Sequence, residues 1–132
     1  MNRRGGLAAV PFLVAVTVLS ACGDSAGPEE SAAGFWDLWA VDGQAPPVSV
    51  DIYTIHTGSL DLRGNGSYAF ALTGVVLGEP WGETESGEWT ATGSSVSLTP
   101  NDGCTNTAVL EERDILKISS HCAEGWELVL VR

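Results

Sequence analysis

Basic side chains are scarce in this chain of 132 residues, which has six Lys and Arg against seventeen Asp and Glu. The formal net charge is −11 at neutral pH. A surface of that sign repels phosphate groups, which excludes nucleic acid and anionic lipid headgroups as partners. The surplus of carboxylates predicts a well-solvated surface rather than a cation site.

Long apolar runs are missing as well. A membrane-spanning helix needs about 20 apolar residues. The longest apolar stretch, Leu7–Leu19, is shorter and is interrupted by Pro11. We therefore expect no segment of this chain to cross a bilayer.

Cysteine and histidine are rare, with three and two residues respectively. Cys104 and Cys122 have no second cysteine pair nearby, and His121 would be their only further ligand, so the spacing does not fit a zinc site. Neither His56 nor His121 accompanies a strained Gly-x-Ser-x-Gly turn. We expect no metal, no cofactor and no enzymatic activity.

Carboxylates gather in two groups, which contain Glu79, Glu83, Glu85 and Glu88, and Glu111, Glu112 and Asp114. Paired carboxylates could act as a general acid and base. Both groups lie beside expected turns, however, where solvated side chains are the simpler interpretation. The region around Asn101–Gly103 lacks the further acidic ligands of a calcium loop.

The N-terminus has the order of a secretory signal, with Arg3 and Arg4 before the apolar run and small residues after it. Leu19-Ser20-Ala21-Cys22 resembles the lipobox of bacterial lipoproteins, in which a diacylglyceryl group is attached to the cysteine and the chain is then cut before it. The resemblance implies that residues 1–21 are removed and that Cys22 is lipidated. A plain signal peptide followed by a chance cysteine is the alternative.

This resemblance also implies a location, the bacterial cell envelope, with the protein held on a membrane by lipid at Cys22. Gly23 follows the cysteine where an aspartate could stand, which favours the outer membrane, facing the periplasm or the exterior. Residues 22–33 are small, polar and acidic and predict a flexible tether. In an oxidising compartment Cys104 and Cys122 are expected to form a disulfide.

Residues 34–132 carry strand signals and are long enough for one small domain. The first signals are the aromatic stretch Phe35–Val41 and the alternating β-branched stretch Val48–Ile55. The last is Trp126–Val131, which is apolar on both faces. A final strand of that kind has no free edge if it pairs back to the first strand, which predicts a closed barrel.

Three hairpins satisfy a register test, because large apolar residues face one another across each turn. Their turns lie at Gly64–Gly66, at Gly93–Ser94 and around Arg113. The pairs expected are Leu62 with Tyr68, Leu60 with Phe70, Gly58 with Leu72, Ala91 with Val96, Trp89 with Leu98, Leu110 with Leu116, Ala108 with Ile118, Asn106 with Ser120, and Cys104 with Cys122. A helix over Ala108–Lys117 is the alternative for the third hairpin.

The sequence thus predicts an all-β fold, a small antiparallel up-and-down barrel of about eight strands. The order of its turn glycines and aromatics resembles that of small lipocalin-like lipoproteins of bacteria. That order comprises Gly34-Phe35-Trp36-Asp37-Leu38, Val41-Asp42-Gly43, Gly58-Ser59-Leu60-Asp61-Leu62, Gly66-Ser67-Tyr68 and Gly87-Glu88-Trp89. The resemblance implies a lipocalin-like barrel.

Two groups of residues are candidates for binding. Five aromatics either fill the core or line a lumen for a small apolar ligand: Trp36, Tyr68, Phe70, Trp89 and Trp126. The segment Gly74–Gly82 is expected to be the longest irregular connection, and four of its residues could contact a protein partner or pack on the barrel end: Val75, Val76, Leu77 and Trp81. We expect a membrane-anchored, non-enzymatic lipoprotein, with a ligand carrier or sensor and a protein-binding inhibitor or adaptor as alternatives.

Overall fold

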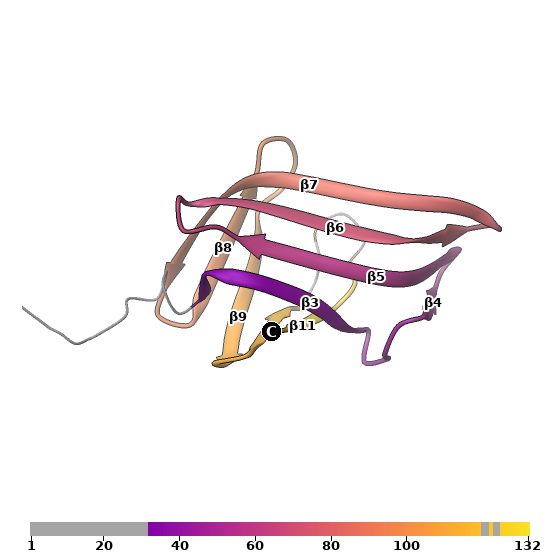
Figure 1. Ribbon diagram of the computed structural model, residues 1–132, viewed down its shortest axis with the longest axis horizontal. Coiled ribbons are helices and arrows are strands. Elements are labelled where there is room, and N and C mark those ends of the chain that lie inside the picture. The colour runs from indigo at the N-terminus through magenta and orange to yellow at the C-terminus, as the bar shows by residue number, and fades with distance from the viewer. Residues whose placement is uncertain (1–31, 120–121, 123–124) are drawn as a thin grey trace, which may run out of the picture.

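The structure, a computed structural model, describes residues 32–119, 122 and 125–132 (Figure 1). Within these residues the chain forms nine β-strands. They are β3 (Gly34–Val41), β4 (Val48–Val50), β5 (Tyr53–Leu62), β6 (Ser67–Val76), β7 (Glu79–Thr92), β8 (Ser95–Pro100), β9 (Asn106–Glu112), β10 (Ile115–Ile118) and β11 (Leu128–Val131).

Strand β3 closes the sheet into a barrel, because it pairs with a strand at each end of the series. The order is β3-β11-β10-β9-β8-β7-β6-β5, and β3 also pairs with β5. Asp37 of β3 is opposite Val131 of β11, and Trp36 is opposite Leu60 of β5, both in antiparallel ladders. The predicted all-β antiparallel barrel of eight strands is confirmed. The short strand β4 lies outside that ring and pairs with the start of β5.

The first two predicted hairpins have the expected registers. In β5 and β6, Leu62 pairs with Tyr68 and Leu60 with Phe70. In β7 and β8, Trp89 pairs with Leu98. Figure 1 shows β5, β6 and β7 running side by side as the longest strands of the sheet. The apolar partners all face the interior, which is why the alternation predicted them correctly.

The third hairpin is also confirmed, and the helix alternative for Ala108–Lys117 is wrong. Leu110 pairs with Leu116 and Ala108 with Ile118. The Cys104–Cys122 disulfide forms with a Cα–Cα distance of 6.2 Å. Ser120, the expected partner of Asn106, lies outside the described residues.

Apolar side chains that alternate along the strands fill the interior of the barrel. The largest fully buried ones are Trp36, Tyr68, Ile55, Leu60, Leu62, Leu72, Leu98, Leu116, Ile118, Leu128 and Leu130. Every strand of the ring except β7 and β9 contributes to this list, and these two supply Trp89, Ala91 and Ala108 to the same core cluster. One contiguous core therefore holds the fold together.

The stretch Val48–Ile55, whose alternation predicted a single strand, is a hairpin instead. The chain reverses at Asp51, which has a positive φ of 56°. Val48 then pairs with Ile55, and both side chains are buried. Aspartate tolerates the left-handed conformation, so the turn forms without a glycine.

The segment Gly74–Gly82 is not the irregular connection that the sequence predicted. Strands β6 and β7 continue through it, and their ladder pairs Val76 with Glu79 around the turn at Leu77 and Gly78. Both turn residues have positive φ, 51° and 82°, as two-residue hairpin turns require.

The two ends of the domain also differ from expectation. Strand β11 begins at Leu128 rather than at Trp126, which precedes it. Ala32, assigned by composition to the tether, is buried and accepts a hydrogen bond of 2.9 Å on its carbonyl oxygen from Nε1 of Trp36. Ala32 therefore belongs to the packed core rather than to a tether. Residues 22–31 lie outside the described part of the chain.

Candidate functional site

All five aromatics predicted either to line a lumen or to fill the core are buried in the barrel interior. Three of them donate hydrogen bonds to other groups of the protein. Trp36 Nε1 donates to Ala32, Trp89 Nε1 donates to the carbonyl oxygen of Arg63 at 2.8 Å, and the Tyr68 hydroxyl donates to Oε2 of Glu85 at 2.8 Å. Their rings and polar atoms are occupied by neighbours, as expected of core residues.

Trp126 differs from those three. It is only 3% exposed, and its Nε1 has no hydrogen-bond partner among the described residues. Its ring contacts Tyr53 edge-on, with centroids 5.3 Å apart, and Tyr53 in turn contacts Trp81 at 4.8 Å. We call Tyr53, Trp81 and Trp126 the aromatic cluster. It contains one buried N–H donor without a partner among the described residues, Nε1 of Trp126.

A second unpaired donor lies near the disulfide. Asn106 is 2% exposed and its Oδ1 accepts a hydrogen bond of 2.7 Å from the backbone N–H of Cys122. Its Nδ2 has no partner within the described part of the chain. A buried amide left half-bonded costs free energy, and no pattern in the sequence identifies Asn106 as such a position.

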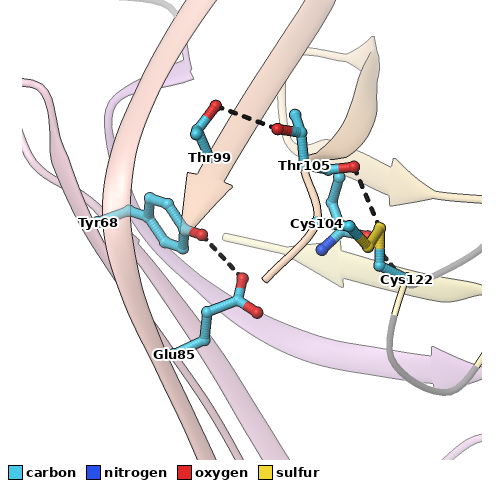
Figure 2. The surroundings of a disulfide bond; sticks show 7 residues. Tyr68, Glu85, Thr99, Cys104, Thr105 and Cys122 are labelled. Atoms are coloured by element: carbon cyan, nitrogen blue, oxygen red, sulfur yellow. Dashed lines mark hydrogen bonds between the residues drawn. A yellow bond between two sulfur atoms is a disulfide. The ribbon is translucent and has the colours of Figure 1, made fainter. Parts of the chain in front are cut away.

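The disulfide (Figure 2) borders an open cleft of about 520 Å³. Glu83 and Glu85 of β7, Asp102, Cys104 and Cys122 are among the residues that line it, so its lining is acidic. Burial, followed by the hydrogen bond and charge of Glu85, raises the pKa of the Tyr68 hydroxyl well above its ordinary value, which keeps Tyr68 protonated.

The four residues predicted to contact a partner lie on the tip of the β6–β7 hairpin. Leu77 at the turn is 78% exposed, whereas Trp81 packs against the core through Tyr53. Val75 and Val76 are half-buried. Only Leu77 of the four offers a large exposed apolar side chain, and the contact role of the group remains a prediction.

A further apolar surface lies on the outside of the barrel. Trp39 of β3 is 62% exposed and lines an open cleft of about 520 Å³. The apolar residues beside it are the half-buried Ile115 of β10 and Val129 and Val131 of β11. None of these four residues was predicted as a binding site, although Trp126–Val131 is apolar on both faces.

His56 is exposed on β5, and His121 lies outside the described part. Across residues 32–119, 122 and 125–132, no three His, Cys, Asp or Glu side chains come together as a potential metal site.

Cys22, the predicted lipidation site, lies outside the described residues. Among the residues that are described, none belongs to a helix with the length and apolar character needed to cross a bilayer. No protein-family model, curated protein or solved structure matches this chain.

Proposed function

We propose that this chain is an exported lipoprotein, held on a bacterial membrane by lipid on Cys22, with its barrel acting as a non-enzymatic module in the cell envelope. The disulfide between Cys104 and Cys122 is the observation that carries the proposal. Such bonds persist in oxidising compartments and are rare in the cytosol. The lipobox-like Leu19–Cys22 supplies the anchor, and Gly23 favours the outer membrane.

The burial of Ala32 agrees with this arrangement. Ala32 lies ten positions beyond Cys22, and a chain of that length spans at most about 35 Å. The barrel would stay close to the membrane that holds the lipid.

Labelling with radioactive palmitate in cells that make the protein tests the anchor. The natural chain should take up the label and sediment with membranes. Cys22→Ala, placed behind the signal sequence of an exported soluble protein, should lose both properties. The double variant Cys104→Ala, Cys122→Ala is the matched control and should keep the label. Persistence of the Cys22→Ala domain in the membrane fraction would contradict the proposal.

A second candidate function, carriage or sensing of a small apolar ligand, is favoured by one observation. Nε1 of Trp126 is a buried donor without a partner among the described residues, and it belongs to the aromatic cluster. A ligand with an apolar body and one acceptor oxygen would satisfy both features. The packed interior around Trp36 and Trp89 restricts such a ligand to the aromatic cluster.

Native mass spectrometry of the protein purified from its own cells tests this second candidate. A carrier should retain a bound small molecule. The variant Trp126→Phe, which keeps an aromatic ring but lacks the N–H donor, should release it. The control Trp39→Phe changes an exposed indole outside the barrel and should retain the molecule. A natural chain whose mass is only that of the lipidated polypeptide would rule the carrier out.

A further inference from the structure

The outer surface of β3, β10 and β11 is apolar over neighbouring strands. Trp39, Ile115, Val129 and Val131 line the cleft described above together with Asp114 and Arg132, and we call the four apolar residues the apolar face. Val131 is directly opposite Ile115, and Val129 is opposite Ala40, next to Trp39. The apolar side chains are therefore contiguous, whereas single exposed hydrophobics scattered over a surface need no explanation.

The apolar face does not result from an unpaired strand edge. Leu128 and Leu130 of β11 are fully buried, so Val129 and Val131 point outward by the alternation of the strand. Strand β11 is paired on both sides, with β10 and β3. The apolar face is thus the outside of a complete barrel wall, so a partner that covers it must approach from outside the barrel.

The position of β3 in the chain indicates the kind of partner that would cover the apolar face. Strand β3, which carries Trp39, is the first strand after the segment that contains Cys22. Trp39 is five residues beyond Gly34, which is about 17 Å along a strand. An anchor no more than about 35 Å of chain from Ala32 brings this surface within reach of the bilayer.

Carboxylates border the apolar face, and two basic residues pair with some of them. Lys117 of β10 lies 3.4 Å from a carboxylate oxygen of Glu127, and Arg132 lies 3.5 Å from one of Asp114. The exposed Asp37 of β3 is directly opposite Val131, so the border of the face stays acidic. A neutral lipid surface fits this pattern, and an anionic one would be repelled by the surrounding carboxylates.

We infer that the apolar face rests on the neutral headgroup surface of the membrane that holds the Cys22 lipid, with Trp39 inserted at the interface. Tryptophan suits this position because its ring is apolar and its N–H reaches polar groups. This inference rests on the proposed function, since the anchor supplies the proximity that a small apolar area alone would not.

Hydroxyl-radical oxidation, read at each residue by mass spectrometry, tests the inference on the lipidated full chain in phosphatidylcholine vesicles. Compared with the same domain exported without lipid and free in solution, Trp39 should oxidise at least about fivefold more slowly. Leu77, exposed on the distant β6–β7 tip, should oxidise at the same rate in both samples. Anionic phosphatidylglycerol added to the vesicles should reduce the protection of Trp39.

Two matched variants examine whether the protection arises from this surface. Trp39→Ser should restore rapid oxidation of Ile115, its neighbour in the cleft. Leu77→Ser, which removes an equally exposed apolar side chain outside the apolar face, should leave Ile115 protected. Near-ultraviolet circular dichroism should confirm that both variants keep their packed cores.

The outcomes separate this inference from the anchor. If the protein is bound to vesicles and Trp39 oxidises as fast as in solution, the inference is overturned and the anchor stands. If the natural chain never enters the membrane fraction, both are overturned. If Trp39 becomes protected in the lipid-free domain as its concentration rises, a second copy of the chain covers the apolar face, which also overturns the inference.

Discussion

The guanidinium carbon of Arg132 lies 4.2 Å from the centre of the Trp36 ring. Its Nη1 donates a hydrogen bond of 2.9 Å to the carbonyl oxygen of Ala33, and its Nη2 donates one of 2.6 Å to that of Arg113. Arg132 follows β11, Trp36 belongs to β3, and Arg113 lies in the β9–β10 turn. One side chain therefore connects three parts of the chain at the seam where the barrel closes.

Arg132→Met should lower the free energy of unfolding by about 2 kcal/mol, because it removes a cation–π contact and two hydrogen bonds while keeping most of the packing. Urea denaturation measures the change. Arg63→Met is the matched control, since the Arg63 side chain is 51% exposed and forms a surface ion pair with Asp61. We expect its effect to stay below about 0.5 kcal/mol. Equal effects of the two variants would disprove the role of Arg132.

Reduction of the Cys104–Cys122 disulfide should lower the free energy of unfolding by about 3 kcal/mol, the loss expected when a closed loop of this size is released in the unfolded chain. Thermal unfolding with and without reductant gives the measurement. The double variant Cys104→Ala, Cys122→Ala should unfold at the same temperature in both conditions. A natural chain that is equally insensitive to reductant would show that the bond contributes nothing.

The buried Tyr68 hydroxyl should make the protein less stable in alkali. Its folded-state pKa is raised, so above pH 10 or so the unfolded chain releases a proton that the folded chain keeps. Stability from this group is then constant below that pH and falls above it, by at most about 1.4 kcal/mol per pH unit.

The difference between the natural chain and Tyr68→Phe isolates this effect, because every other alkaline group is common to both. Urea midpoints should be recorded at several values between pH 8 and pH 11. We expect the gap between the two proteins to be constant at the lower values and to narrow above pH 10. A gap that stays constant throughout would contradict the prediction.

Two glycines of β7 should differ sharply in their tolerance of a methyl group. A Cβ at Gly87 would overlap the backbone carbonyl of Thr99 on β8, whereas a Cβ at Gly82 would lie 3.6 Å from the nearest atom, an ordinary contact. Gly87→Ala should cost about 2–4 kcal/mol, since backbone atoms would have to move apart. Gly82→Ala should leave the urea midpoint nearly unchanged, and similar losses in both variants would disprove this explanation.

Much of this fold could be predicted because its pairing is local. Leu60 and Phe70, or Trp89 and Leu98, lie close in sequence and face each other across a short turn. Alternation fixes which side of each strand is apolar, and the turn fixes the register. The same register predicted that Cys104 and Cys122 are opposite each other, and these two residues form the disulfide.

Two of the errors, the single strand expected over Val48–Ile55 and the irregular connection expected over Gly74–Gly82, have a common physical cause. The turns at Asp51 and Leu77 place a residue other than glycine at positive φ, and no local pattern signals such a turn. Each is imposed by the ladder on either side of it, where Val48 meets Ile55 and Val76 meets Glu79. Local propensity is overridden there by pairing that the whole sheet determines.

The candidate sites were harder to foresee than the fold. Burial of Trp36 and exposure of Trp39 follow from which side of β3 meets the core, and that is settled by strands about twenty and ninety residues away. The unpaired donors of Asn106 and Trp126 depend on what surrounds each atom in three dimensions. Sequence spacing carries no information about a missing hydrogen-bond partner.

The pairing of β3 with β11 has a consequence for how the protein is made. During synthesis residue 34 emerges far ahead of residue 128, so β3 must wait for β11 before its second edge is covered. Contacts between such distant residues form slowly. The barrel is therefore expected to close only after the whole polypeptide has been made, and one edge of β3 stays unpaired until then.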